Sequence, residues 1–293
     1  MQQYILRSGR IEDREDEKRL AMQLWTELSA RPFEETRFEF GVNWTRFLSV
    51  VSEKHIEAAV EKLHSWLGDL HGKTFLDVGC GSGIHSLAAL RLGASRVVSI
   101  DYDSHSVGCS QEMKRRFAPD ANWTVEQGSA LDESYIRSLG LFDVVYSWGV
   151  LHHTGHMWAA LDVVTIPVGD VLFLAIYNDQ RVMSRVWHTV KKTYHRMPRP
   201  LRPVYAAVAI APAELLTLVG AKGPRGYFRF WRDYYHRRGM SRWHDIVDWI
   251  GGLPFEVATP HAIFAFYRER GFTLERMFTC GSGLGCNEFL FRR

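Results

Sequence analysis

The chain of 293 residues is long enough for one large domain with additions or for two small domains, and its 46% hydrophobic and 24% charged residues argue against an intrinsically disordered protein. The net charge is only +3, but the charge is unevenly distributed along the chain. The four cysteines, at positions 80, 109, 280 and 286, form no C-x-x-C pair and match no zinc spacing, and no signal peptide is recognisable, so a cytoplasmic protein is expected.

Residues 1–70 are expected to form a helical N-terminal extension. Between residues 11 and 28, apolar side chains recur at helical spacing in a charge-rich segment, which predicts a solvated helix with one apolar stripe. This helix ends at Arg31 and Pro32, because the residue before a proline avoids the helical conformation. An amphipathic helix over residues 50–67 then leads into the main domain.

A short aromatic segment, FEFGVNW at residues 38–44, interrupts this extension. Its aromatic content is too high for an ordinary surface loop. One interpretation is a packing plug under the next helix. The other is a lid in which Trp44 or Phe40 faces a cationic ligand, since an aromatic face attracts a desolvated cation by about 1–2 kcal/mol.

Residues 74–83, TFLDVGCGSG, are the stretch around which the rest of the chain is organised. The mainly apolar run at residues 75–78 predicts a buried parallel strand. Glycines follow at positions 79, 81 and 83, and a turn without Cβ atoms can bend sharply and lie against a ligand. A helical pattern begins directly after the turn and stops at Gly93. Strand, glycine turn and helix make one half of a nucleotide-binding unit.

The residues around this turn indicate which nucleotide it binds. A dinucleotide fingerprint needs a third small residue five places after the first glycine, but Ile84 and Ser86 occupy that place in the two possible registers. Asp77 would repel a pyrophosphate and favour a ligand with an ammonium group. Asp101 ends a second apolar run about twenty residues further on, the spacing at which a carboxylate reaches ribose hydroxyls. Two acids so placed suit an adenosine with a positively charged tail.

Beyond Asp101, helices and strands alternate as in a doubly wound α/β fold. We predict helices over residues 104–117 and 136–139 and strands over residues 123–126, 142–146 and 171–177. The carboxyl ends of the last two strands open into the crevice where such sheets bind ligands. Residues 147–153 and the pair Tyr177 and Asn178 are therefore expected at this crevice.

The motif DVGCGSG at residues 77–83, Asp101, FDVV at 142–145 and LHH at 151–153 resemble the class I S-adenosylmethionine-dependent methyltransferases, and most closely the branch with the ubiquinone and menaquinone biosynthesis methyltransferases. The resemblance covers roughly residues 73–178 and 262–291. It implies an α/β, Rossmann-like seven-stranded sheet with order 3-2-1-4-5-7-6 and an antiparallel seventh strand. It also implies S-adenosyl-L-methionine as the cofactor.

The resemblance further implies cofactor contacts in the loops after successive strands. These are Asp77, Gly79, Cys80, Gly81, Gly83, Asp101, Tyr102, Ser129, Ala130, Ser147 and Trp148. Ser129 stands in the turn where the family usually has an acid that contacts the adenine amino group. Its hydroxyl could accept the same hydrogen bond.

The expected reaction is methylation of a small or lipophilic acceptor, most readily at oxygen. Such a transfer depends on alignment and on exclusion of water, and an oxygen acceptor must also lose its proton. A neutral histidine suits that task, so His152 is the expected base, with His244 and Asp245 as competing candidates. A structural role for His152 is equally open. His152 and His156, four residues apart, could hold a metal from one helix face, but no third ligand or acidic partner is arranged nearby. Acceptor contacts are expected from Trp44, His153, Tyr177, Asn178 and Trp243.

We expect four parts: the extension 1–70, the cofactor half 71–180, a helical insert 181–260 and the last helix and strands 261–293. Between residues 181 and 242 the insert carries fourteen basic residues against two acidic ones, with tryptophan and tyrosine interleaved. Phosphate contacts use lysine and arginine while aromatic rings stack on bases, so an RNA methyltransferase is an alternative, although a nucleic-acid partner is not the favoured expectation. A second alternative is a protein without catalytic activity that binds the cofactor and acts as a partner of another protein.

Residues 204–219, VYAAVAIAPAELLTLV, form the most apolar long run. The run is interrupted by Pro212 and Glu214 and is shorter than the about twenty apolar residues that span a bilayer. One interpretation is a buried helix packed on the core. The other is a helix in the interface of an anionic membrane, where the cations between residues 196 and 229 act together with its apolar area. That would place the protein at the inner face of the membrane, next to a lipophilic acceptor.

Overall fold

The computed structural model describes residues 44, 48, 51–238, 242–281 and 285–293, and the side chains of residues 235–238 and 244 are not part of this description. Every described residue belongs to one compact unit, residues 36–293. The helix predicted over residues 11–28 and the aromatic residue Phe40 lie outside the described residues.

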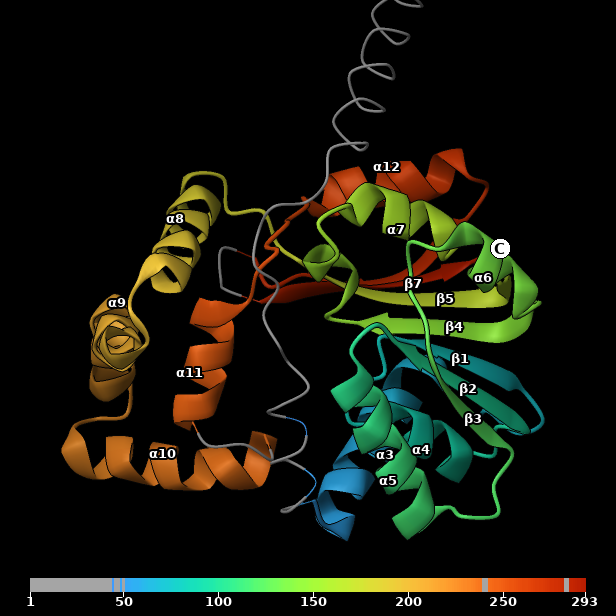
Figure 1. Ribbon diagram of the computed structural model, residues 1–293, viewed down its shortest axis with the longest axis horizontal. Helices are drawn as coiled ribbons and strands as arrows, with labels where there is room; N and C mark the ends of the chain where they lie inside the picture. The colour runs from blue at the N-terminus through green and yellow to red at the C-terminus, as the bar shows by residue number, and fades with distance from the viewer. Residues whose placement is uncertain (1–43, 45–47, 49–50, 239–241, 282–284) are drawn as a thin grey trace, which may run out of the picture. The chain divides into compact units, whose positions relative to one another are not determined.

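Seven strands form one sheet in the order β3-β2-β1-β4-β5-β7-β6 (Figure 1). The strands are β1 (Thr74–Val78), β2 (Arg96–Asp101), β3 (Trp123–Gln127), β4 (Phe142–Trp148), β5 (Val168–Tyr177), β6 (Thr273–Phe278) and β7 (Cys286–Arg292). Neighbouring strands from β3 to β5 are parallel, and β7 is antiparallel to both β5 and β6. The strand order and the antiparallel seventh strand are thus confirmed. The order reverses between β1 and β4, where open sheets bind ligands beyond the carboxyl ends of their strands.

Helices cover both faces of this sheet, which explains why its central strands are apolar on both sides. One face carries α3 (Glu53–Leu67), α4 (Ile84–Arg91) and α5 (Ser104–Phe117), and the other carries α6 (Glu133–Ser138), α7 (Met157–Val163) and α12 (Pro260–Glu269) (Figure 1). Successive residues of β1 alternate between the two cores. Phe75 packs on the α3–α5 side and Leu76 on the α6–α12 side.

Capping side chains set the helix starts that the sequence pattern places imprecisely. α6 begins at Glu133, one turn before the predicted residue 136, because the Asp132 carboxylate accepts a hydrogen bond from Tyr135 N over 3.0 Å. α12 begins at Pro260, because Thr259 Oγ1 accepts a hydrogen bond from Ala262 N over 3.2 Å.

A helical insert lies between β5 and α12, as expected. It contains α8 (Val182–Arg196), α9 (Arg202–Gly220), α10 (Pro224–Arg238) and α11 (Arg242–Gly251) (Figure 1). The insert has a hydrophobic core of its own, in which Trp187 and Tyr194 of α8 meet Ala206 and Ile210 of α9 and Ile250 of α11. This core holds the four helices together as one layer next to the sheet.

Candidate functional site

The glycine turn after β1 is the centre of the candidate cofactor site. Gly79, Gly81 and Gly83 have φ angles of 81°, 54° and 77°, in the left-handed region that residues with side chains rarely adopt. A Cβ atom on Gly79 would lie 2.3 Å from a methyl carbon of Val150, which belongs to the loop after β4. The turn and this loop therefore approach too closely for a side chain at position 79.

The indole of Trp44 lies on the same turn. Its nearest ring atoms are 3.0 Å from the position that a Cβ atom on Gly81 would occupy. The ring also packs against the core on the α3–α5 face of the sheet. The position of Trp44 over the turn is compatible with a lid. Its packing against the core is equally compatible with a packing plug. Its contact with a cation stays a prediction.

Asp101 lies at the carboxyl end of β2, beside the glycine turn. Its Oδ2 accepts a hydrogen bond from Gly81 N over 3.0 Å, and its Oδ1 accepts one from Asp103 N over 2.9 Å. These bonds fix the orientation of the carboxylate. A carboxylate has about four acceptor positions, so Asp101 can accept hydrogen bonds from ribose hydroxyls in addition.

Asp77 lies beneath the turn rather than at its surface. The side chain is buried and its Oδ2 accepts a hydrogen bond from Ser86 Oγ over 2.6 Å. Ser86 Oγ is in turn 2.7 Å from Ser99 Oγ, which accepts a hydrogen bond from the indole of Trp123. Burial raises the pKa of Asp77 to about 7 against the lowering effect of Ser86, and the charge of Asp101 adds to the rise. Two acids so close together suit a positively charged ligand.

Cys80, within the turn, is a buried thiol. Burial, with the negative charges of Asp101 and Asp77, raises the pKa of this thiol well above its usual value. Its Sγ accepts a hydrogen bond from Ser110 Oγ over 3.2 Å. Since the thiolate is the reactive form, Cys80 is suited to shaping the turn and not to nucleophilic chemistry.

The expected contacts around the adenosine end lie at the ends of β2 and β3. Tyr102, next to Asp101, is 57% exposed. Ser129 Oγ accepts a hydrogen bond from Leu131 N over 3.1 Å, and Ala130 packs against the α6–α12 core. These three residues border the crevice through loops that follow adjacent strands, so the sheet brings together positions far apart in the sequence.

The side chains of Ser147 and Trp148, at the end of β4, are engaged within the fold. Ser147 Oγ donates a hydrogen bond to Val78 O over 2.9 Å and is buried. The Trp148 indole donates to Glu288 Oε1 over 2.8 Å, and Lys62 Nζ lies 4.4 Å from its ring centre. The expected cofactor contacts of these two residues are therefore reduced to their backbone, because the side chains tie β4 to β1 and to β7.

His152 lies on the acceptor side of the crevice, in the short 3-10 turn Leu151–His153. Its ring is fully buried and lies against the ring of Tyr177, with centres 3.8 Å apart. Tyr177 N donates to Nδ1 over 3.4 Å, so in the neutral ring the proton is on Nε2, and this nitrogen has no hydrogen-bond partner among the described residues. Burial, together with the charges of His153 and Lys191, lowers the pKa of His152 well below its usual value. His152 thus presents a neutral N–H donor.

His153 has a structural partner. Its Nδ1 donates to Pro254 O over 2.6 Å, and Glu256 N donates to the carbonyl of His152 over 3.0 Å. The Glu256 carboxylate then accepts from Met157 N and so caps α7. These bonds join the turn after β4 to the segment that follows α11, and they fix the position of both histidines.

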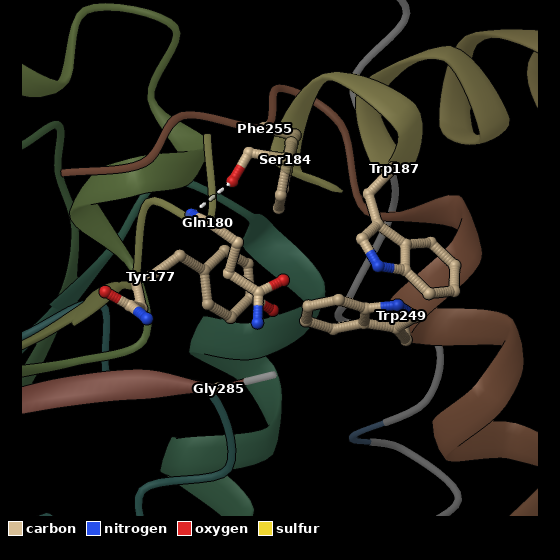
Figure 2. Close-up of a pocket in the computed structure, with 8 residues that line it drawn as sticks. Tyr177, Gln180, Ser184, Trp187, Trp249, Phe255 and Gly285 are labelled. Carbon is tan, nitrogen blue, oxygen red and sulfur yellow. Dashed lines mark hydrogen bonds between the residues drawn. The ribbon is translucent and has the colours of Figure 1, made fainter. Parts of the chain in front are cut away.

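A small hollow opens between the end of β5 and the insert (Figure 2). Its wall consists of Tyr177, Asn178, Gln180, Ser184, Trp187, Trp249, Phe255 and Gly285. The ring centres of Tyr177 and Trp249 are 5.2 Å apart, and those of Trp249 and Trp187 are 5.6 Å apart. Like Nε2 of His152, the indole nitrogens of both tryptophans are buried without a hydrogen-bond partner among the described residues. The hollow and the adjacent histidine therefore offer unused N–H donors.

Lys191 lies directly behind this aromatic wall and is fully buried. Its Nζ donates to the carbonyl of Trp249 and lies 4.6 and 4.7 Å from the ring centres of Trp249 and Phe255. Burial lowers the pKa of Lys191 to about 7. Lys191, Trp187, Trp249 and Phe255 are not among the site residues expected from the sequence. The spacing of Trp187 and Lys191, four residues apart on one helix face, is the signal that could have indicated the first two.

The other expected acceptor and catalytic residues are placed differently. Asn178 borders the hollow, but its amide joins Gly281 O at 2.7 Å and Asn287 Nδ2 at 3.0 Å. Trp243 packs against the core of the insert. Asp245 accepts a hydrogen bond from Tyr234 and lies 3.8 Å from Arg242, so it belongs to a polar cluster inside the insert rather than to the surroundings of His152. The side chain of His244 lies outside the described residues.

Within the described ranges, no group of three histidine, cysteine or carboxylate side chains is arranged to hold a metal ion. His152 and His156 therefore have no third ligand there.

Comparison with known proteins supports the cofactor side of this site. Residues 57–147 match the family model of ribosomal protein L11 methyltransferase (PrmA). A ribosomal protein L11 methyltransferase from Alteromonas mediterranea is 53% identical over 53 residues, which is 17% of this chain and 18% of that protein. The corresponding protein from Tolumonas auensis is 51% identical over 53 residues. The chain thus matches about a fifth of the length of these curated relatives.

Similarity to solved structures extends further along the chain. PKMT2 from Rickettsia typhi superposes with a TM-score of 0.52 at 13% identity, covering 88% of this chain and 54% of that one. An O-methyltransferase family protein from Burkholderia thailandensis superposes with a TM-score of 0.50 at 13% identity, covering 83% and 56%. Together with the strand order, these similarities show that the fold is that of the class I S-adenosylmethionine-dependent methyltransferases.

The comparisons do not show the expected relationship to the ubiquinone and menaquinone branch, since the matched family is that of the L11 methyltransferases. The matched residues include the glycine turn and Asp101 and end within β4. They include none of α8 to α11. The match therefore concerns the cofactor half of the chain. It gives no information on the residues that would bind the acceptor, which are inferred from the geometry of the hollow.

Proposed function

We propose that this chain transfers a methyl group from S-adenosyl-L-methionine to an acceptor molecule. The observation that carries the proposal is the left-handed glycine turn after β1, held against the Asp101 carboxylate at the end of β2. The three glycines let the cofactor approach the backbone of the turn closely, and a fixed carboxylate at this position accepts hydrogen bonds from its ribose. The family-model match over residues 57–147 supports the same assignment.

The charges of the site suit this cofactor. The charge of Asp101 raises the pKa of Asp77, so a ligand with an ammonium group and a sulfonium would relieve the repulsion between the two acids. When bound, the cofactor supplies an electrophilic methyl group. The residues of this chain bind it through the turn and Asp101, and Trp44 on Gly81 can exclude water from that side.

We further propose that the acceptor enters the hollow between Tyr177, Trp249 and Phe255 and is a small or lipophilic molecule methylated at oxygen. Four of the eight wall residues are aromatic, which favours a flat apolar acceptor and keeps water from the reacting atoms. An acceptor such as a phenol, which loses its proton to water before the transfer, presents an oxygen anion that His152 Nε2–H can hold in line, since alignment supplies much of the rate of a direct displacement. The role of general base, expected from the sequence, needs a free Nε2 lone pair, which the hydrogen bond from Tyr177 N disfavours.

Methylation of a ribosomal protein is a second candidate, and the matched family supports it. The RNA hypothesis receives less support from the insert. Several of the aromatic residues interleaved with its basic residues point inward, as Trp187 and Tyr194 do, and Tyr227 and Trp231 donate to Glu214. These rings form the insert core and are not a stacking surface for bases.

Labelled S-adenosyl-L-methionine and fractionated cell extract test these proposals. Label in an organic-soluble product would support the lipophilic acceptor, whereas label in ribosomal protein or in RNA would contradict that choice and keep the methyltransferase proposal. Calorimetry with the cofactor alone tests the cofactor site. If the chain neither binds the cofactor nor transfers label to any fraction, the proposed function is wrong.

A further inference from the structure

Helix α9 is the most apolar helix of the described chain, yet it is mostly exposed. Residues 199–220 contain an 18-residue window with a mean hydropathy of 1.6, and by length and composition alone this helix could cross a membrane. Only 11% of the most apolar window is buried, and within α9 only Ala206 and Ile210 are buried side chains. A helix of the protein core would show the opposite, so the expectation of a buried helix is wrong.

The exposed apolar side chains of α9 lie mainly along one side. Val204, Val208, Leu215 and Val219 recur at intervals of four, seven and four residues, which brings them onto one helical face. They are 63%, 68%, 61% and 70% exposed, and Leu216 beside them is 74% exposed. We call these five residues the α9 apolar face. A contiguous apolar surface of this kind marks an interaction site in a soluble domain.

The opposite side of α9 is firmly attached to the insert. Ala206 and Ile210 pack with residues of α8 and α11. Glu214 accepts hydrogen bonds from Tyr227 over 2.8 Å and from Trp231 over 3.0 Å, and it forms an ion pair with Arg242 at 2.6 Å. Withdrawing α9 to span a bilayer would leave this partly buried ion pair and the insert core without partners. An attached helix with one apolar face can instead lie parallel to a membrane surface.

Basic residues flank the α9 apolar face at both ends. Arg196 and Arg199 precede it, and Lys222, Arg225 and Arg229 follow it; all five are exposed. None of the five forms an ion pair with another described residue. Figure 1 shows α9 end-on, on the far side of α11 from the sheet, so the surface is not shared with the sheet or its helices. An apolar strip between unpaired cations is complementary to a layer of anionic headgroups over acyl chains.

We propose that the α9 apolar face docks on an anionic membrane surface, with its side chains at the acyl boundary and the flanking cations among the lipid phosphates. This docking does not depend on the proposed methyl transfer. If the chain both docks on a membrane and transfers a methyl group, a lipophilic acceptor would have only a short distance to travel from the membrane to the hollow. Trp187 in α8 and Trp249 in α11, which line the hollow, belong to helices that contact α9 directly.

Co-flotation of the full-length chain with vesicles tests the docking without any need for activity. Vesicles of phosphatidylcholine alone are compared with vesicles that contain about a third phosphatidylglycerol, at low and at high salt. We expect binding to the anionic vesicles at low salt, weakened by added salt and by removal of the anionic lipid. The substitution Val208→Glu together with Leu216→Glu should weaken binding at least tenfold. Leu141→Glu, at an apolar side chain that is 67% exposed outside the insert, is the matched control and should leave binding unchanged.

Charge variants separate the two contributions. Arg199→Gln and Arg225→Gln should each weaken binding about fivefold, whereas Lys54→Gln, at an exposed lysine in α3, should have no effect. Failure of the full chain to bind anionic vesicles would overturn the proposal. So would sedimentation as a dimer that Val208→Glu converts to monomer, because a second copy of the chain would then cover the face. Circular dichroism spectra that match the wild-type spectrum are required for every variant.

Discussion

Gly81 N donates a hydrogen bond to Asp101 Oδ2 over 3.0 Å and so connects the turn after β1 to the end of β2. The other oxygen of the same carboxylate, Oδ1, accepts a hydrogen bond from Asp103 N. Asp101 therefore orders the two loops that form one side of the crevice before any ligand binds. A preordered carboxylate loses little freedom when it accepts ribose hydroxyls, which favours affinity.

Asp101→Asn tests this role. The amide group keeps the shape of the carboxylate, but its NH2 would face one of the two backbone N–H donors, and the negative charge is lost. We expect the affinity for S-adenosyl-L-methionine to fall by about 1.5–3 kcal/mol, the usual contribution of hydrogen bonds to a charged group. Isothermal titration calorimetry measures this change. Asp120→Asn, at an exposed position outside the crevice, should bind as the wild type does.

Gly79→Ala should destabilise the chain through both strain and collision. The new Cβ atom would lie 2.3 Å from a Val150 methyl carbon, in a backbone conformation with φ of 81°. Gly140→Ala is a matched control, because its φ is 79° but nothing lies within 4 Å of its Cβ position. We expect the control to lose about 1–2 kcal/mol of unfolding free energy and Gly79→Ala to lose clearly more. If denaturant unfolding gives the same loss of unfolding free energy for both variants, the Val150 side chain moves aside without an energetic cost.

The glycine turn, Asp101 and the sheet order were predictable because their signals are local. Residues 77–83 specify a strand and a turn within a few positions, and apolar runs separated by helices specify the parallel strands. The boundary of α6 was less predictable, since the Asp132 cap competes with the apolar pattern that begins at Ile136. Local capping chemistry decided that boundary.

The acceptor side was not predictable to the same degree, because packing between distant segments creates it. Trp187 and Trp249 meet only when α8 and α11 pack together, 62 positions apart in the sequence. The proton position of His152 depends on the backbone N–H of Tyr177 at the end of β5, 25 positions further along the chain. Trp148 was expected at the cofactor, but its indole is held by Glu288 of β7. None of these three contacts can be predicted from the spacing of its residues in the sequence.

Stability should depend on pH through Asp77. Its pKa in the folded chain is about 7, against an ordinary value of 3.8, so between these values the folded state holds a proton that the unfolded chain has lost. The free energy of unfolding should therefore fall as pH rises from about 4 to about 7, by at most about 4 kcal/mol. Asp77→Asn should remove this decline in urea unfolding at several pH values. An unchanged decline in the variant would assign the effect to other groups.

Asp143 provides a control of opposite sign for that experiment. Hydrogen bonds from the backbone and hydroxyl of Thr74 hold the pKa of Asp143 below its usual value. Its contribution to stability is therefore present above the ordinary pKa and is lost as pH falls through the lowered one. Asp143→Asn should reduce stability at neutral pH and leave the decline between pH 4 and 7 in place.

His152 allows a test that separates a donor from a base. Its lowered pKa keeps the ring neutral at physiological pH, and Tyr177 N favours the tautomer with the proton on Nε2. We expect His152→Ala to lower the rate of label transfer about a hundredfold, with cofactor affinity unchanged by calorimetry. His152→Gln retains an N–H donor of similar reach and should recover much of this loss. If His152 acts as a base, His152→Gln should be as slow as His152→Ala, and the wild-type rate should decline as pH falls through the pKa of the histidine.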